Sequence, residues 1–327
     1  MAIEHPVNLT ASIRTNELAC SPQFIRGGLT NENAPLDRNF VLASHGVQLA
    51  SGITAVIAGQ PMLSGASPED EFSGNDLLDL YARYGNECAA HLSGTWAFLI
   101  ADPLQQRILL ATDRMGRLPI YFAVQDHNVV ASATLPDLRK LSPSRGVDSQ
   151  NLYNYVYFHM IPAPGSVWSG MQKLRAGEQL EVTAAGWNTS RYWTPSFRET
   201  AADKALRHTS LQQHLKGAVQ RSQSNTGKTG AFLSGGLDSS TVAGMLSELQ
   251  GGSCDAYAIG FDAEGYDEMA YARITAEHFG IRLHEYYVTP DDVVTALPAV
   301  AASFDEPFGN SSALPAYFCA RMAASDG

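Results

Sequence analysis

The sequence predicts two parts, an α+β part rich in antiparallel strands followed by an α/β part with a parallel sheet. A length of 327 residues fits about two domains. Short β-like runs between turn residues fill the first half, whereas strands alternate with helix-like segments after a polar stretch at Asn188–Lys204. We therefore place the domains at residues 1–195 and 205–327.

The first part contains one clear helix and four clear strands. Apolar residues recur at helical spacing over Asn75–Gly85, and Gly85 is placed to end that helix. Because turn residues separate the β-like runs, we expect one antiparallel meander. Its strands are predicted at Thr95–Ala101, Arg107–Ala111, Tyr121–Val124 and Val129–Ala133.

The second part alternates helices with strands. The predicted helices are Leu206–Gln223, Ser239–Gln250, Asp267–Phe279 and Asp291–Ser303, and the predicted strands are Gly230–Leu233, Ala256–Phe261 and Leu283–Val288. Parallel strands need a long return path, which helical crossovers supply, so this order predicts a parallel sheet. Ligands of such sheets bind beyond the carboxyl ends of the strands.

Composition argues against several classes of function. A formal net charge of −11 disfavours a nucleic-acid partner, so we expect a small-molecule substrate. Four distant cysteines without a C-x-x-C pair predict reduced, mostly buried thiols and neither a zinc site nor a disulfide framework. The sequence shows no secretory signal and no apolar run long enough to cross a bilayer. We therefore expect a cytoplasmic protein without membrane contact. A homodimer is the one assembly that we consider for it.

The strongest candidate site is the loop that follows the strand Gly230–Leu233. It reads Ser-Gly-Gly-Leu-Asp-Ser-Ser over Ser234–Ser240. Two glycines let the backbone approach an anion, and the next helix begins there with its positive dipole end. Ser234 and Ser239 add hydroxyl donors, and Asp238 is a candidate ligand for Mg²⁺. The loop therefore predicts a phosphate-binding site.

Two other interpretations of this region were weighed. A Gly-Gly turn with a Ser/Asp cap is common between a strand and a helix. The order of strand, double glycine, acidic residue and helix favours a phosphate site over that turn. Gly227-Lys228-Thr229 resembles the end of a P-loop, but Ser222 stands where the first glycine is required and the segment precedes the strand. We reject the P-loop.

Phe232–Ser240 resembles the signature of the N-type ATP pyrophosphatases, and specifically of the asparagine synthetase family. Further segments similar to that family are Leu92–Phe98, Asp113–Tyr121, Ile161–Pro164, Ala258–Phe261, Tyr266–Glu268, Ala272–Arg273, His284–Glu285, Phe304–Pro307 and Ser311–Pro315. The resemblance spans nearly the whole chain. It implies an Ntn-hydrolase-like αββα sandwich, a glutaminase-like class II amidotransferase domain, followed by a parallel-sheet ATP-pyrophosphatase domain of the adenine-nucleotide α-hydrolase kind.

The resemblance also implies a reaction. The carboxylate of aspartate or a similar acid attacks the α-phosphate of ATP, and pyrophosphate leaves with Mg²⁺. Ammonia or an amine then displaces AMP to form an amide. Such a site must hold two anions in line and stabilise the pyrophosphate as charge develops, a task for backbone donors and a metal ion.

Roles for individual residues follow from the resemblance. The residues expected to bind ATP are Leu233, Ser234, Gly235, Gly236, Asp238, Ser239, Ile259 and Gly260. The backbones of Leu233 and Ile259 would contact adenosine, and Ser234–Ser239 the pyrophosphate. Asp238 is the expected Mg²⁺ ligand. Asp238, Ser239 and Glu306 are the expected catalytic residues, although the acidic pair Asp305-Glu306 before a proline can also simply begin a loop. His284, on a strand, is expected to be structural.

The sequence departs from the family pattern twice. The family's glutaminase opens with a nucleophilic cysteine, whereas here Ala2 follows Met1, and Ala58-Gly59-Gln60-Pro61 replaces an expected asparagine-glycine-glutamate segment. We expect the first part to keep its fold without releasing ammonia from glutamine. The sequence also stops at Gly327, before a further strand and acidic loop, so we expect little synthetase activity from this chain alone.

Three interpretations of function stay open at this stage. The chain resembles an asparagine synthetase that uses free ammonia. It also resembles relatives that join an amine already on the substrate, such as β-lactam synthetases and lasso-peptide cyclases. A non-catalytic nucleotide-binding module is the third. A tRNA-modifying relative is disfavoured by the acidic charge and by the lack of paired catalytic cysteines.

Overall fold

The computed structural model describes residues 10–14, 47–48, 52–65, 72–125, 128–142, 146–197, 204–223, 227–262 and 267–327. Ala2, Cys20 and Tyr266, which entered the sequence analysis, lie outside these ranges. The chain divides into two compact units. Unit 1 comprises Met1–Phe197 and Asp305–Gly309, and unit 2 comprises Arg198–Phe304 and Asn310–Gly327. Both contain helices and sheets, which confirms a mixed α/β protein.

Unit 1 contains two antiparallel sheets. The six-stranded sheet has the order β10-β9-β5-β4-β3-β2 and the four-stranded sheet the order β1-β7-β6-β8. The strands are β1 (Thr10–Arg14), β2 (Val47–Gln48), β3 (Thr54–Leu63), β4 (Leu92–Asp102), β5 (Arg107–Thr112), β6 (Tyr121–Gln125), β7 (Asn128–Ser132), β8 (Met171–Lys173), β9 (Glu178–Thr183) and β10 (Gly186–Arg191). The helices are α1 (Gly74–Tyr84), the 3-10 helix η2 (Gly85–His91), α2 (Leu135–Leu141) and α3 (Ser149–Phe158).

The four strands expected in one meander form two hairpins in different sheets, so that prediction is wrong. β4 and β5 belong to the six-stranded sheet, and β6 and β7 to the four-stranded one. The buried carboxylate of Asp113, just after β5, accepts hydrogen bonds from Met115 N at 2.8 Å and Arg117 N at 3.2 Å. These bonds form a tight turn, after which the chain enters the other sheet instead of returning along β5.

The polar stretch expected to be a domain junction begins as a strand. β10 runs to Arg191 and pairs with β9 from Gly186↔Thr183 to Arg191↔Glu178. Its side chains are exposed or half-buried. A strand at the edge of a sheet pairs its backbone on one side only and needs few apolar side chains. The polar sequence of β10 therefore gave no indication of a strand.

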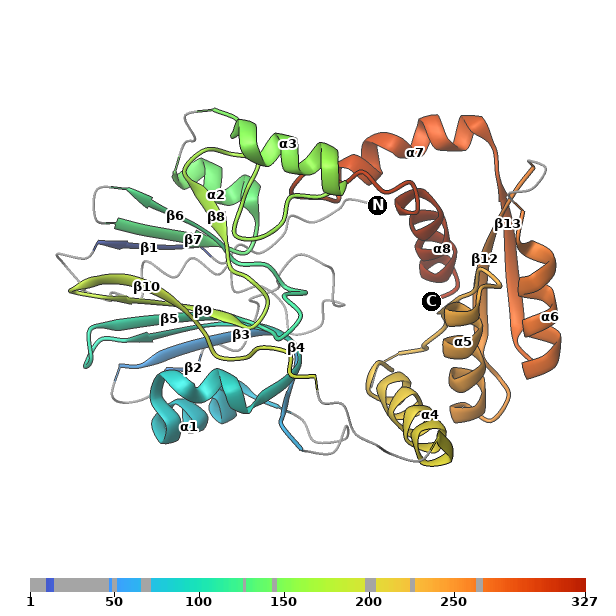
Figure 1. Cartoon of the computed structure of the whole chain (residues 1–327), viewed down its shortest axis with the longest axis horizontal. Coiled ribbons are helices and arrows are strands. Elements are labelled where there is room, and N and C mark those ends of the chain that lie inside the picture. The colour runs from blue at the N-terminus through green and yellow to red at the C-terminus, as the bar shows by residue number, and fades with distance from the viewer. Residues whose placement is uncertain are drawn as a thin grey trace. The chain divides into compact units, whose positions relative to one another are not determined.

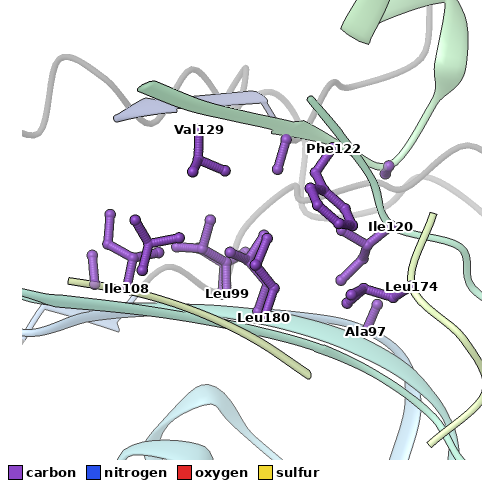
Figure 2. Close-up of a cluster of buried hydrophobic side chains, with 14 of the residues drawn as sticks. Ala97, Leu99, Ile108, Ile120, Phe122, Val129, Leu174 and Leu180 are labelled. Atoms are coloured by element: carbon purple, nitrogen blue, oxygen red, sulfur yellow. The ribbon is translucent and has the colours of Figure 1, made fainter. Parts of the chain in front are cut away.

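The core of unit 1 forms between the facing sheets (Figures 1 and 2). Successive side chains of β4 point to opposite faces, so Leu99 lies in this core whereas Trp96 and Phe98 lie on the outer face with α1. Figure 2 shows Phe122 and Val129 of the four-stranded sheet opposite Leu99 and its neighbours. On the outer face of the four-stranded sheet, α2 packs Leu135 and Leu138 against Tyr121 and Val130. The layers of unit 1 are therefore helix, sheet, sheet and helix.

β3 and β4 approach each other closely at two glycines. Gly59 has φ +94°, and a Cβ there would lie 2.3 Å from the carbonyl oxygen of Thr95. Gly94 has φ +86°, and a Cβ there would lie 2.3 Å from the carbonyl oxygen of Gln60. Only glycine fits both positions, and Ala58–Pro61 pairs with β4 inside the six-stranded sheet.

Unit 2 contains a parallel sheet in the order β11-β12-β13. The strands are β11 (Ala231–Phe232), β12 (Asp255–Phe261) and β13 (Arg282–Val288), and the helices are α4 (Lys204–Arg221), α5 (Leu237–Leu249), α6 (Met269–Phe279), α7 (Pro290–Ala302) and α8 (Ala313–Ser325). The alternating elements predicted up to Ser303 are confirmed within a few residues at each end. Helix α8 was not predicted.

The two faces of the parallel sheet carry separate apolar cores. Ala256 and Ala258 of β12 pack with α5 and α6, whereas Ile259 and Phe261 pack with α7 and α8. Small residues on the first face let α5 and α6 lie close to the strands. In the part of the chain that the structure describes, no helix has the length and apolar character to cross a membrane.

Candidate nucleotide site

The candidate site begins where β11 ends. Leu233 is buried, and its N–H donates to the carbonyl oxygen of Tyr257 at 2.9 Å, which continues the pairing of β11 with β12. Helix α5 starts at Leu237, with Gly236 as its N-cap residue and no side-chain cap. The turn Ser234–Gly236 therefore lies at the carboxyl end of a parallel strand and at the amino end of a helix, where backbone N–H groups favour an anion.

Two serine hydroxyls converge on this turn. Ser234 Oγ and Ser239 Oγ lie 3.0 Å apart, and Ser239 Oγ donates to the carbonyl oxygen of Gly236 at 3.1 Å. Either hydroxyl can be the donor in the contact between the two serines. The N–H groups of Ser234 and Gly236 also point at these hydroxyls, at 3.3 and 3.4 Å. These exposed, long bonds leave the donors free to turn to a ligand at small cost.

Gly235 brings the turn against helix α6. Its φ of +87° favours glycine, and a Cβ there would lie 2.6 Å from Tyr271 Cβ and 2.7 Å from Ala272 N. A side chain at this position would have to displace backbone. The turn is thus packed against α6 on one side and open to solvent at Gly236, Leu237 and Asp238 on the other.

The neighbouring strand β12 contributes Ile259 and Gly260 near its carboxyl end. Ile259 is half-buried toward α7 and α8. Gly260 points to the other face, where a Cβ would lie 2.6 Å from Cε1 of the Tyr287 ring. The Tyr287 hydroxyl accepts a hydrogen bond from Arg273 Nη2 at 3.4 Å, and Arg273 pairs bidentately with Glu285 at 2.9 and 2.6 Å. This pairing lowers the pKa of Glu285.

Asp238 lies exposed in the first turn of α5. No group of three or more His, Cys, Asp or Glu side chains that could hold a metal ion occurs within the described residues. A divalent ion at Asp238 would therefore take most of its ligands from phosphate oxygens and water, as Mg²⁺ commonly does.

Glu306 lies in unit 1, not in the unit that contains the loop. Its carboxylate accepts a hydrogen bond from Val167 N at 3.0 Å and forms an ion pair with Lys173. The predicted residues Leu233–Gly236, Asp238, Ser239, Ile259 and Gly260 all belong to unit 2, at the ends of two adjacent strands. The structure thus brings together the predicted ATP-binding residues within unit 2, whereas the polar partners of Glu306 belong to unit 1.

His284 is a partnered histidine, as predicted. Its Nε2 lies 2.7 Å from Asp255 Oδ1 and its Nδ1 lies 3.1 Å from Asp326 Oδ2, while its ring stacks on Tyr257 with centroids 4.7 Å apart. Hydrogen bonds from Arg282, and then from His284, lower the pKa of Asp255 to about 2. Every polar atom of the imidazole is engaged, which fits a structural role.

Sequence reasoning missed three residues that shape these environments. Tyr287 faces Gly260 because the two residues are paired across β12 and β13, so aligning the two predicted parallel strands would have found it. Tyr271 meets Gly235 through the packing of α6, and Lys173 meets Glu306 across 133 residues. No local pattern marks either of these contacts.

Two families match separate segments of the chain. The family described as asparagine synthase matches residues 210–327, and that described as glutamine amidotransferase domain matches residues 73–193. A protein of Methanocaldococcus jannaschii provisionally named asparagine synthetase [glutamine-hydrolyzing] 2 is 29% identical over 76% of this chain and 49% of its own length.

Two further relatives cover a similar share of the chain. Asparagine synthetase [glutamine-hydrolyzing] 1 of Bacillus subtilis is 27% identical over 76% of this chain and 39% of its own length. Carboxyethyl-arginine beta-lactam-synthase of Streptomyces clavuligerus is 26% identical over 76% of this chain and 48% of its own length. The chain thus spans about half, or less, of the length of these relatives. Over these two matched segments and most of its length, the chain is therefore similar to the asparagine synthetase family.

Proposed function

We propose that this chain provides the ATP-binding part of an ATP-dependent amide-forming synthetase that adenylates the carboxylate of aspartate or a similar small acid. The observation that carries the proposal is the geometry of Ser234–Ser239. Backbone N–H groups, two converging hydroxyls and the start of α5 meet in a turn where a Cβ would collide with α6. Such a turn fits the pyrophosphate end of a nucleotide.

The residues have distinct tasks in this proposal. Ser234, Gly235, Gly236 and Ser239 bind the β- and γ-phosphates through N–H and O–H donors, and the backbones of Leu233, Ile259 and Gly260 line the adenosine. Asp238 holds Mg²⁺, which would neutralise phosphate charge when bound.

The chemistry keeps its atoms in balance. A carboxylate oxygen of the substrate bonds to the α-phosphorus of ATP. The bond between the α-phosphorus and the oxygen that bridges it to the β-phosphorus breaks, and pyrophosphate leaves. Nitrogen then bonds to the acyl carbon, a proton is lost from nitrogen and AMP leaves. The part of the loop is to fix the leaving pyrophosphate in line with the attack and to stabilise its charge through preorganised donors.

A second candidate is an intramolecular amide former, which the similarity to the beta-lactam synthase of Streptomyces clavuligerus favours. The two candidates share the adenylation step and differ in the source of nitrogen. Pyrophosphate release that depends on aspartate together with ammonia supports the first. Release that depends on a substrate carrying both a carboxylate and an amine supports the second.

We further propose that unit 1 is a glutaminase-like domain with an Ntn-hydrolase-like fold that does not hydrolyse glutamine. Its four layers and the match over residues 73–193 support the fold. The segment Ala58–Pro61, in place of asparagine-glycine-glutamate, supports the loss of activity. The free, buried thiols of Cys88, Cys254 and Cys319 fit a reducing compartment such as the cytoplasm. Release of glutamate from glutamine by the purified protein would refute the loss of activity.

Calorimetric titration with ATP, with and without Mg²⁺, tests the nucleotide site. We expect the native chain to bind Mg·ATP, and Asp238→Asn to weaken that binding about tenfold, or about 1.4 kcal/mol. Binding of ATP without Mg²⁺ should change little in this variant, because only the metal ligand is lost. Absence of binding heat from a chain with intact circular dichroism would contradict the proposal. ATP binding without AMP formation under any substrate would indicate a non-catalytic module.

A further inference from the structure

The segment Asp305–Gly309 carries contacts that the proposed nucleotide site does not use. It lies between α7 and α8 in the sequence, yet it clusters with unit 1. Four polar contacts hold it there, and each goes to a different part of unit 1. Their partners are Leu135 N, Val167 N, the Lys173 ammonium and the carbonyl oxygen of His159.

The central contact joins Glu306 to Lys173. Both side chains are largely buried, with 9% and 14% of their surface exposed. The Lys173 ammonium also donates to the carbonyl oxygen of Ile161 at 2.7 Å. Glu306 Oε1 accepts from Val167 N at 3.0 Å while Oε2 pairs with Lys173, so both carboxylate oxygens are engaged by unit 1. Each oxygen of the Glu306 carboxylate thus already accepts one hydrogen bond from another part of unit 1.

The flanking residues strengthen the anchorage. Asp305 Oδ2 accepts from Leu135 N at 3.4 Å, at the start of α2, whose own N-cap residue Thr134 makes no cap hydrogen bond. Asp305 thus provides a side-chain acceptor for an N–H group in the first turn of that helix. Gly309 N donates to the carbonyl oxygen of His159 at 2.8 Å, and a Cβ at Gly309 would lie 3.1 Å from His159 Cβ.

We propose that Lys173 is a positioning residue, and that unit 1 serves as a scaffold that holds Asp305–Gly309 in place through the Lys173–Glu306 ion pair. On this view, Glu306 is an anchor and not a catalytic residue. Unit 1, which we propose does not hydrolyse glutamine, would then serve to hold Asp305–Gly309 in place. The inference does not depend on nucleotide binding.

Hydrogen exchange on the full chain tests the anchor. Lys173→Met keeps the apolar stem and removes the charge, which leaves the buried Glu306 carboxylate without its partner. We expect amide exchange in peptides that cover residues 305–312 and Val167 to become at least tenfold faster. The double variant Lys173→Met/Glu306→Gln should exchange more slowly than Lys173→Met alone, because no buried charge is left unpaired.

Lys140→Met is the matched control. Lys140 also pairs with a carboxylate of unit 1, Asp137, but its side chain is 73% exposed. Exchange in residues 305–312 should stay within twofold of the native chain in this variant. If Lys173→Met fails to fold and the double variant folds, that rescue supports the same coupling.

Two outcomes would overturn the proposal. The first is exchange within twofold of the native chain for Lys173→Met. The second is exchange in residues 305–312 within twofold of the native chain for Glu306→Gln, since the segment would then be held without the ion pair. Because exchange is read without ATP, failure of the nucleotide site leaves this test intact.

Discussion

Gly235 and Gly252 share a left-handed backbone and differ in their surroundings. Their φ angles are +87° and +85°, but a Cβ at Gly235 meets α6 at 2.6 Å, whereas nothing lies within 4 Å of one at Gly252. Both alanine variants carry the backbone cost of roughly 1–2 kcal/mol. Only Gly235→Ala must also displace the turn that carries the phosphate donors.

This pair of glycines gives a matched prediction. We expect Gly235→Ala to weaken Mg·ATP binding at least tenfold and Gly252→Ala to leave the affinity within about twofold, as measured by calorimetry. Equal affinities for the two variants would show that the close approach at Gly235 has no bearing on the ligand.

Asp305 gives a prediction on pH. Burial, and then the nearby Glu306 and Asp137 carboxylates, raise the pKa of Asp305 against the opposing effects of Leu135 N and Lys173. The native state therefore binds the proton more tightly than the unfolded chain, whose aspartate titrates near 3.9. The stability that this proton contributes is present below that value and is lost as pH rises through the native pKa.

Asp305→Asn removes the charge and keeps an acceptor for Leu135 N. We expect its melting temperature to exceed that of the native chain at pH 7, and the difference to shrink as pH falls toward 4. Thermal unfolding at several pH values checks this expectation. A difference that grows toward low pH would mean that the carboxylate is stabilised in the native state.

At the scale of elements, helix α1 begins with a capping box. Ser73 N donates to Asp76 Oδ2 at 2.7 Å, and Asp76 N donates to Ser73 Oγ at 3.4 Å. Ser73→Ala removes one half of this reciprocal pair, so we expect a loss of about 1 kcal/mol in the free energy of unfolding by denaturant titration. No measurable loss would indicate that packing of Leu77 and Tyr81 alone determines where the helix starts.

Elements with strong contrast between faces could be predicted from the sequence, and others could not. Helix α1 has an apolar face, Gly85 at its end and clear helical spacing. Helix α3 has no buried residue and no charged one, so no apolar face stands out from a polar face. β5 and β6 belong to different sheets because of the turn at Asp113, and the spacing of apolar residues along the sequence does not predict that turn.

The site divides in the same way. The phosphate loop is local, and its glycines, serines and aspartate lie within six residues, so the sequence reveals it. Glu306 is defined by partners 133 and 139 residues earlier in the chain. Its neighbours Asp305 and Pro307 suggest a loop and say nothing of Lys173.

At the scale of the molecule, unit 1 is incomplete without residues from late in the chain. A fragment ending at Phe197 would contain Lys173 without Glu306. In the full chain we expect Lys173→Met to lower stability by on the order of 3 kcal/mol, since it leaves a buried charge unpaired. In the fragment the same change removes an uncompensated cation and should be neutral or stabilising.

Denaturant unfolding of the full chain and of the fragment, each with and without Lys173→Met, measures whether the change in the free energy of unfolding differs in sign between the two lengths. Lys140→Met should have the same small effect at both lengths, because its partner Asp137 is present in each. Equal destabilisation by Lys173→Met at both lengths would show that Glu306 contributes nothing to the lysine's environment.

The late arrival of Glu306 also orders events during synthesis. Lys173 leaves the ribosome 133 residues before its partner, an interval of roughly 7 to 27 seconds at usual elongation rates. During that time the Lys173 ammonium in the nascent β6–β8 region lacks the Glu306 carboxylate with which it forms an ion pair in the folded chain. Unit 1 therefore cannot complete its contacts until translation has passed Glu306.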